Sequence, residues 1–337
     1  MDWFEQITGF RELNYVDTRK QLEVVNGRLH SKVNGKGFQI GDLGLVSLKR
    51  LRELAFEGGS LPGRLKVSIV RGDVRSMHSA TEYSGAMFQV ASQFNLLEMV
   101  SPEVTPEHGV TRYQNDPTQG PACAIAAGAA TIFRNYFAMV DGQEGQTHDR
   151  QFDGLADMGK ALCHALEMPL AALWSMRNGY AICSRQGLDA ISAYLISLKP
   201  AQTDDLRDLL RIGVHSDVEV TEQPGNRTQL VSQAFCSALP VAYGRVPSEH
   251  WSAFGRLVLE GAYEATMWAA VLNAQRAKSN IVLLTRIGGG AFGNDGDWID
   301  SAMRRALRLV ADFCLDVRIV SYGTPSVAIQ KIANDFE

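Results

Sequence analysis

The sequence lacks the features that mark several common classes of protein. No run approaches the roughly 20 apolar residues that span a bilayer, and the opening "MDWFEQITGF" does not follow the basic-then-apolar order of a signal peptide. The 5 cysteines include no C-x-x-C pair, which is typical of reduced thiols and gives no zinc site. We therefore expect a soluble, cytoplasmic protein that does not bind membranes, with export as an effector left open.

A surplus of positive charge and the standard nucleotide motifs are also missing. The formal net charge is −4, whereas nucleic-acid-binding proteins usually carry a basic surplus. The G-x-x-x-x-G-K-[ST] loop, an early G-x-G-x-x-G loop and the G-x-S-x-G nucleophile motif are absent. The histidines are isolated and show no metal-ligand spacing. We therefore expect no nucleic-acid partner, no bound metal and no cofactor.

The second half of the sequence alternates between strand-like and helix-like segments. Apolar strand patterns and helical patterns follow one another from Tyr180 to Ser321, with a long helix from Ser248 to about Gln275. Such alternation predicts a three-layer α/β/α fold with a largely parallel mixed sheet that is covered on both faces. Residues 1–60 are expected to form an N-terminal extension packed on a domain of residues 61–337.

Two loops rich in small residues precede helical segments. "IGGGAFGN" follows the strand pattern that ends at Thr285, and "TQGPACAIA" opens a helix of small residues near Gly120. Backbone N–H groups in such loops, beside the positive end of a helix dipole, allow phosphate oxygens to approach closely. Ligands of open α/β sheets bind beyond the carboxyl ends of the strands, so the pair of loops predicts a diphosphate site. The alternative is that either loop is only a structural turn.

The order of these motifs resembles that of the macrodomain superfamily. A strand ending in "GDV" at residues 72–74 is followed by a strand leading to "QVASQFN", a small-residue helix and, much later, the loop "GGGAFGN". Ser92 stands where the family has its first Asn, Asn294 stands where it usually has Pro, and the stretch after Asn95 is longer than usual. These departures resemble a divergent branch of ADP-ribosyl hydrolases, similar to poly(ADP-ribose) glycohydrolases or MavL-type enzymes.

The resemblance implies roles for individual residues. Asp73, with the backbone of Val74, would bind the adenine amino group, and Tyr322 would pack near the adenine. Asn95 would contact the hydroxyls of the distal ribose. Asp73 is also typical of a turn or cap, and Tyr322 could simply close the core. The diphosphate would be bound by Gln119, Gly120, Pro121, Ala122 and Cys123 in the first loop, and by Gly288, Gly289, Gly290, Ala291, Phe292, Gly293 and Asn294 in the second.

Hydrolysis at the anomeric carbon of ribose needs a carboxylate that activates water or stabilises an oxocarbenium-like transition state. Asp116 and Glu98 are the leading candidates because they lie near the predicted distal-ribose loops, and Asp295 is a substrate-side candidate that could instead cap a helix. Glu260 and Glu264 lie one turn apart on the long helix, where we expect them to be exposed to solvent; the apolar pattern "EGAYEATMWAA" leaves the alternative that one of them points into the site.

The resemblance thus implies a hydrolase that removes ADP-ribose from an ADP-ribosylated protein, with water and without a metal. ADP-ribosyl-arginine is one substrate that acidic residues at the mouth of the site would suit. A reader that binds ADP-ribose without catalysis is the alternative from another class. An α/β enzyme that acts on another nucleotide or sugar phosphate is a third hypothesis.

Overall fold

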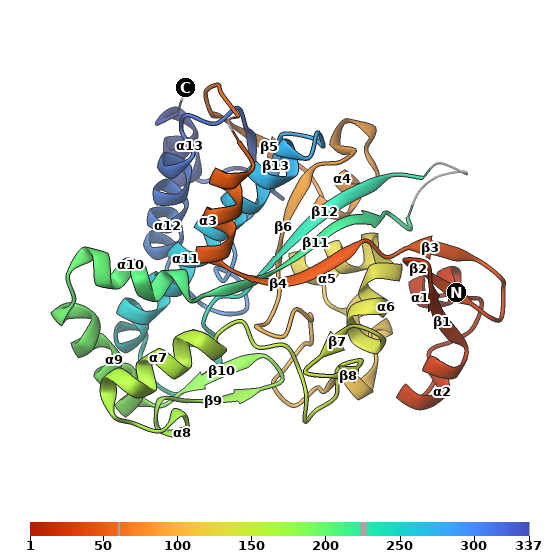
Figure 1. The fold of residues 1–337 in the computed structure, drawn as a ribbon, viewed down its shortest axis with the longest axis horizontal. Helices are drawn as coiled ribbons and strands as arrows, with labels where there is room; N and C mark the ends of the chain where they lie inside the picture. The colour runs from red at the N-terminus through yellow and green to blue at the C-terminus, as the bar shows by residue number, and fades with distance from the viewer. Residues whose placement is uncertain (60, 223–227, 337) are drawn as a thin grey trace.

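A seven-stranded mixed sheet forms the centre of the protein (Figure 1). The computed structural model describes residues 1–59, 61–222 and 228–336. Along the order β4-β11-β12-β6-β13-β14-β5, neighbours from β12 to β5 are parallel, and β11 is antiparallel to both β4 and β12. The strands span Asp42–Ser47 (β4), Lys66–Arg71 (β5), Met87–Ala91 (β6), Arg211–Glu219 (β11), Leu230–Cys236 (β12), Ile281–Leu284 (β13) and Asp316–Ser321 (β14).

Helices cover both faces of this sheet, which confirms the predicted three-layer α/β/α fold (Figure 1). Val282 and Leu283 lie in different hydrophobic clusters, because successive side chains of a strand point to opposite faces. The face with Val282 carries Leu48–Glu57 (α3), Arg185–Ser197 (α9), Ser248–Gln275 (α11), Gly296–Leu309 (α12) and Val327–Asn334 (α13). The face with Leu283 carries Val74–Ser79 (α4), Gln119–Ala126 (α5) and Gly128–Tyr136 (α6).

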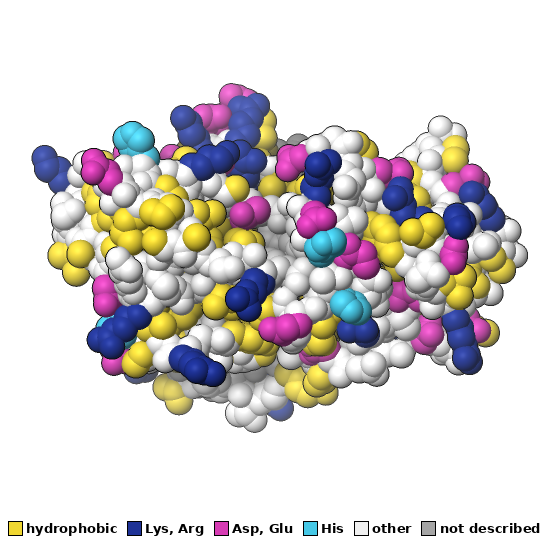
Figure 2. Space-filling model, turned by 90° about the horizontal axis from the view of Figure 1, so that it is seen from below, with side chains coloured by type: hydrophobic (Ala, Val, Ile, Leu, Met, Phe, Trp, Pro, Cys, Tyr) yellow, Lys and Arg dark blue, Asp and Glu magenta, His cyan; other side chains and the backbone are white. Residues whose placement is uncertain are grey.

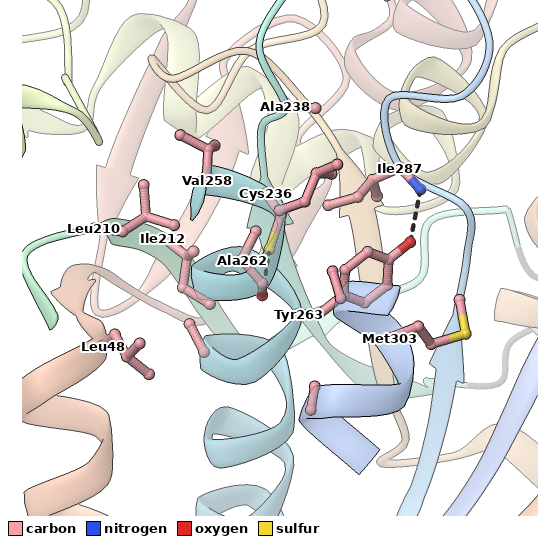
Figure 3. Packing of buried hydrophobic residues seen from close by; sticks show 14 of the residues in the cluster. Leu48, Leu210, Ile212, Cys236, Ala238, Val258, Ala262, Tyr263, Ile287 and Met303 are labelled. Atoms are coloured by element: carbon pink, nitrogen blue, oxygen red, sulfur yellow. Dashed lines mark hydrogen bonds between the residues drawn. The ribbon is translucent and has the colours of Figure 1, made fainter. Parts of the chain in front are cut away.

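The long helix α11 has the bounds that the sequence predicted, and it is the centre of the larger core. Figure 3 shows its residues Val258 and Ala262 beside Leu48 of α3, Ile212 of β11 and Cys236 of β12. All five are buried. A helix that is covered by other helices and by a sheet can be apolar around most of its circumference. This explains the local sequence "EGAYEATMWAA".

The expectation that the acids of α11 are exposed was wrong for Glu264. This carboxylate is buried, accepts a hydrogen bond from Nε of Arg52 at 2.6 Å and pairs with Arg305. Arg52 belongs to α3 and Arg305 to α12, so the two helices that cover α11 also supply the charges that Glu264 needs. Glu260 is partly exposed and pairs with Arg207 at 2.6 Å. Both acids thus join helices of the core.

The first forty residues form a small unit of their own beside α5 and α6. They contain helices α1 (Trp3–Thr8) and α2 (Tyr15–Lys20) and an antiparallel sheet of β1 (Leu22–Val25), β2 (Arg28–Ser31) and β3 (Gly37–Gln39). Phe4 and Leu29 share a hydrophobic cluster with Ile125 and Ile132. After this unit, β4 pairs with β11 of the main sheet and α3 packs on α11, whereas the division of the chain at residue 60 stays a prediction.

The remaining elements lie in the connections between strands of the main sheet. The connection from β6 and the hairpin of β9 and β10 lie together at the lower side of Figure 1. None of the described helices is long and apolar enough to cross a membrane. These connections contain η1 (Thr81–Tyr83), η2 (Pro106–His108), η3 (Thr111–Asn115), β7 (Met139–Val140), β8 (Gln143–Glu144), α7 (Ala156–Leu166), α8 (Leu170–Leu173), β9 (Trp174–Arg177), β10 (Tyr180–Cys183), α10 (Pro200–Asp208) and η4 (Val241–Tyr243).

Candidate active site

A cavity of about 330 Å³ lies where β6, β12 and β13 end. Its volume falls within the range of small-molecule sites. Figure 2 shows the molecule from the lower side of Figure 1, where acidic and histidine side chains lie near the middle of the face. Both predicted loops and both leading carboxylates reach this cavity: its lining includes Glu98, Asp116, Gln119, Pro121, Gly288, Gly290, Ala291 and Phe292. The two loops therefore meet at one site, as the diphosphate hypothesis requires.

The first loop is held against the end of β6 by its own backbone and by one amide side chain. Oε1 of Gln119 accepts a hydrogen bond from the N–H of Ala91, and Nε2 donates to the carbonyl of Gln89, each at 2.8 Å. A Cβ atom on Gly120 would overlap the carbonyl oxygen of Ala91. These contacts place the first turn of α5, whose N–H groups have no partner within the helix, at the cavity.

The second loop is fixed by an asparagine and leaves one glycine open to the cavity. Nδ2 of Asn294 donates to the carbonyl of Leu239 at 2.8 Å and to that of Gly288 at 3.2 Å, so this side chain supports the loop. Gly288 has a φ of 78°, and a Cβ there would lie 2.5 Å from that of Ala238. A Cβ on Gly290 would have no neighbour within 4 Å. Gly290 is thus where a ligand can approach the backbone most closely.

A tyrosine of α11 anchors the start of the second loop. The hydroxyl of Tyr263 donates to the carbonyl of Thr285 at 2.6 Å and accepts from the N–H of Ile287 at 3.1 Å (Figure 3). Between these two residues, Arg286 lines the cavity and pairs with Asp300. Burial raises the pKa of Asp300, with Arg286 opposing it. Arg286 therefore places a positive charge beside the backbone amides of the loop.

Glu98 lines the cavity, and its pKa is raised by burial. Its carboxylate is buried, Oε1 pairs with Nη2 of Arg134 at 3.4 Å, and Oε2 has no hydrogen-bond partner among the described residues. Burial raises the pKa of Glu98 to about 7, and the Arg134 charge and the Tyr113 hydroxyl oppose this rise. Glu98 can therefore hold or release a proton near neutral pH, which is what a general acid or base requires.

Arg134 has a fixed position beneath Glu98. Its Nε donates to the carbonyl of Leu96 and its Nη2 to the hydroxyl of Thr131, each at 3.1 Å. The guanidinium also lies 3.9 Å from the ring centroid of Phe235. Burial lowers the pKa of Arg134, and the Glu98 charge opposes this effect. The pair forms one buried unit in which each charge depends on the other.

The second leading carboxylate has a different environment. Asp116 is half-buried at the rim, and its Oδ1 accepts a hydrogen bond from the N–H of Thr118 at 2.9 Å. It directly follows η3 and precedes α5, so its position depends on both. Two carboxylates at one cavity, one buried and one near water, form a pattern that separates acid and base roles.

One wall of the cavity is aromatic. The ring of Tyr180 lies 5.0 Å from that of Tyr243 and 5.3 Å from that of Phe292, measured between centroids. The hydroxyl of Tyr180 donates to the carbonyl of Met99 at 2.5 Å. Sequence reasoning missed Tyr180 and Tyr243, because they come from β10 and η4 and belong to no motif. It also missed Arg286, whose place just before the glycine loop was the available signal.

Other predicted ligand residues lie elsewhere. Asp73 is exposed and caps α4 by accepting a hydrogen bond from the N–H of Arg75 at 3.0 Å, and Val74 is buried in the core. Tyr322 is 87% exposed, so it does not close the core. Asp73 and Tyr322 follow β5 and β14, which are neighbours, at the same edge of the sheet as the cavity. An adenine site between them remains a prediction.

Asn95 is buried and has its partners within the protein. Its Nδ2 donates to Gln151 at 2.8 Å, its Oδ1 accepts from the N–H of Leu97 at 3.1 Å, and it does not line the cavity. Asp295 caps α12 through the N–H of Asp297 at 2.8 Å and also lies outside the lining. Both residues therefore have local structural partners, and their implied contacts with a ligand stay predictions.

The remaining small residues of the two loops support the backbone. Ala122, Cys123, Gly289 and Gly293 do not line the cavity. Burial holds the pKa of the Cys123 thiol well above its usual range, so this cysteine is a packing residue rather than a nucleophile. Among the residues that the structure describes, no group of three or more His, Cys, Asp and Glu side chains is placed to hold a metal ion.

Comparisons with known proteins gave only remote similarities. No family model and no curated protein matched the chain. Among solved structures, the poly(ADP-ribose) glycohydrolase from Thermomonospora curvata is 15% identical with a TM-score of 0.43, over 95% of this chain and 96% of that one. The glycohydrolase from Deinococcus radiodurans in complex with ADP-ribose is 10% identical with a TM-score of 0.40, over 87% and 92%. At such values, a function has to be argued from the residues of the chain itself.

Proposed function

We propose that the protein is a hydrolase that removes ADP-ribose from an ADP-ribosylated protein by attack of water at the distal ribose. One observation carries this proposal: Glu98, with its pKa raised to about 7, lies in a cavity that also receives both predicted phosphate loops. A site that only binds a nucleotide has no need of a buried carboxylate whose proton is exchangeable near neutral pH.

The diphosphate would lie between the first turn of α5 and the loop around Gly290. Both present backbone N–H groups, and Arg286 adds a fixed positive charge on the same side. Such groups bind phosphate oxygens without side-chain rearrangement. The aromatic wall around Tyr180 and Phe292 would pack against the ribose or the base. The reacting carbon then lies on the side of the cavity where Glu98 is found.

The two carboxylates divide the reaction between them. Protonated Glu98 donates its proton to the oxygen or nitrogen atom that leaves the anomeric carbon, as the bond to the protein side chain breaks. A water molecule attacks the same carbon and gives its proton to the carboxylate of Asp116. The products are ADP-ribose and the free side chain, and transfer of a proton from Asp116 to Glu98 through water restores the enzyme.

The substrate is a modified protein rather than free nucleotide in this proposal. ADP-ribosyl-arginine would suit the acidic rim, because a guanidinium pairs well with carboxylates such as Asp116. We propose that the reaction needs neither a metal nor a cofactor, so that turnover persists in excess EDTA. Loss of turnover on chelation, with recovery on addition of a divalent cation, would contradict this part of the proposal.

The test is to incubate the protein with a mono-ADP-ribosylated protein and to measure the ADP-ribose released. Release is expected from the wild type, and Glu98→Gln should lower it by about 10²–10⁴-fold. Calorimetry should show that the variant still binds ADP-ribose within about threefold of the wild type. Binding without release by the wild type would identify a reader. Tighter binding of ATP or NAD than of ADP-ribose would identify another nucleotide enzyme.

A further inference from the structure

A glutamate of the small N-terminal unit is bound to the loop beneath the active site. Oε1 of Glu12 accepts hydrogen bonds from the N–H of Val110 at 2.8 Å and from the hydroxyl of Tyr136 at 2.7 Å. Oε2 accepts from the N–H of Thr111 at 2.8 Å. Hydrogen bonds to a carboxylate are roughly twice as strong as those between neutral groups. A residue almost 100 positions earlier in the chain thus holds this turn.

The space around Glu12 is built for this contact. Gly109 has a φ of 79°, and a Cβ there would overlap the carboxylate of Glu12. Nε1 of Trp3, also from the N-terminal unit, donates to the carbonyl of Thr111 at 3.2 Å. The N-terminal unit therefore binds the backbone of residues 109–111 in two ways. The carboxylate of Glu12 accepts hydrogen bonds from backbone N–H groups, and the indole of Trp3 donates one to a backbone carbonyl.

The turn that Glu12 holds leads directly to the two carboxylates of the cavity. Tyr113, fully buried, donates its N–H to the carbonyl of Val110 at 3.1 Å, and its own carbonyl accepts from the N–H of Asp116 at 3.1 Å. The hydroxyl of Tyr113 accepts from the N–H of Glu98 at 3.0 Å. One short segment therefore connects Glu12 to the backbone of Glu98 and to the rim position of Asp116.

We propose that Glu12 is a positioning residue of the active site, which acts through Tyr113 to hold Glu98 in place. The inference rests on the proposed hydrolase function for its consequence in turnover, but the link itself is structural. The N-terminal unit then contributes to the position of a catalytic carboxylate and is not an independent extension. None of residues 1–40 lines the cavity, so the unit acts on the site through this connection and not by direct contact.

The expected consequence follows from the geometry of acid catalysis. A proton donor has to lie within hydrogen-bond reach of the atom it protonates, and a displacement of about 1 Å can cost 10²-fold in rate. Glu12→Gln puts an amide NH₂, which is a donor, against backbone N–H donors, so the turn at residues 109–111 should shift. ADP-ribose affinity should change little, because the phosphate loops do not depend on Glu12.

The experiment compares Glu12→Gln, Tyr113→Phe and the double variant in the full chain, at a temperature well below unfolding. Each single variant should lower kcat about tenfold or more, with KM and ADP-ribose affinity within about twofold of the wild type. The double variant should lose no more turnover than the more impaired single variant, because both act through one contact. Glu12→Asp, which keeps a charged acceptor, should retain more turnover than Glu12→Gln. Glu23→Gln, an exposed acid of β1, is the control and should match the wild type.

A second readout does not depend on catalysis. Amide hydrogen exchange in Glu12→Gln should become faster at Val110, Thr111 and Glu98, but not in the loop around Gly290. Unchanged exchange at Glu98, unchanged kcat, or multiplicative effects in the double variant would each overturn the proposal. If the wild type releases no ADP-ribose, the proposed function fails while exchange at Glu98 still decides whether the link exists.

Discussion

Gly120, the second residue of α5, packs against the carbonyl oxygen of Ala91, which is the last residue of β6. A Cβ atom at residue 120 would overlap that oxygen. This contact sets how closely the helix can start beside the end of the strand. The sequence motif "TQGP" suggested a glycine that lets phosphate approach. The structure shows that this glycine lets a helix start close to the end of a strand, and a phosphate site beside it remains a proposal.

Replacing Gly120 by alanine should therefore affect stability as well as binding. We expect Gly120→Ala to lower the free energy of unfolding by about 1–3 kcal/mol, because the clash is with backbone that cannot rotate away. Chemical denaturation measures this change. Gly323→Ala is the matched control, since a Cβ there has no neighbour within 4 Å, and it should change stability by less than about 0.5 kcal/mol. Equal losses in both variants would contradict the packing role.

Gly290 offers the sharpest test of the second loop. A Cβ on the neighbouring Gly289 would lie 3.0 Å from Ile299, whereas one on Gly290 meets no neighbour within 4 Å and Gly290 lines the cavity. Gly290→Glu should weaken ADP-ribose binding at least about tenfold, because it brings a negative charge to the proposed phosphate site. Calorimetry measures the affinity, and Gly290→Gln controls for size. Unchanged affinity in Gly290→Glu would remove this loop from the diphosphate site.

The raised pKa of Glu98 predicts how turnover depends on pH. Burial raises its pKa from 4.5 to about 7, so the proton that the reaction needs is lost as the pH rises through 7. We expect kcat to fall about tenfold per pH unit above that value. The same shift predicts how stability depends on pH. The folded state binds this proton more tightly than the unfolded chain does, so the protonated carboxyl stabilises the fold fully below about pH 4.5. This stabilisation is lost as the pH rises through about 7.

Arg134 allows this assignment to be checked. Removing its charge in Arg134→Met should raise the pKa of Glu98 further and move the descending limb of the pH profile to higher pH. Arg207→Met removes an arginine that pairs with Glu260, and neither residue lines the cavity, so this variant should leave the descending limb where it is. A limb that stays near pH 7 in Arg134→Met would mean that another group titrates there.

Asp116 and Asp295 are distinguished by a pair of variants. Asp116→Asn should lower kcat by about 10²-fold or more, because an amide cannot accept a proton from water. Asp295→Ala removes the cap of α12 and should cost about 1 kcal/mol of stability, without a comparable loss of turnover. Release of ADP-ribose and chemical denaturation measure the two effects. A greater loss of turnover in Asp295→Ala than in Asp116→Asn would indicate that Asp295 takes part in the reaction.

Local sequence signals located the loops of the candidate site whose shape depends on the backbone conformation of a few neighbouring residues. The loop at Gly288 could be found because glycine at positive φ and a following helix leave a pattern within a few residues. The rim position of Asp116 was inferred from the long connection that carries it. Tyr180 could not be found in this way, since its hairpin lies almost 90 residues after β6 and only the folded chain brings the two together.

The sequence by itself determined the layers of the fold and the two small-residue loops. The continuous apolar run of β13 and the apolar circumference of α11 are local properties, and they indicate elements that are covered on more than one side. Only the tertiary structure decided what each acid does. Glu264 and Glu98 are both buried glutamates, but Glu264 lies between Arg52 and Arg305. Within the part of the chain that the structure describes, Glu98 pairs with one arginine, Arg134, and has one oxygen without a partner. Burial and charge set a pKa, and both come from residues that are distant in the chain.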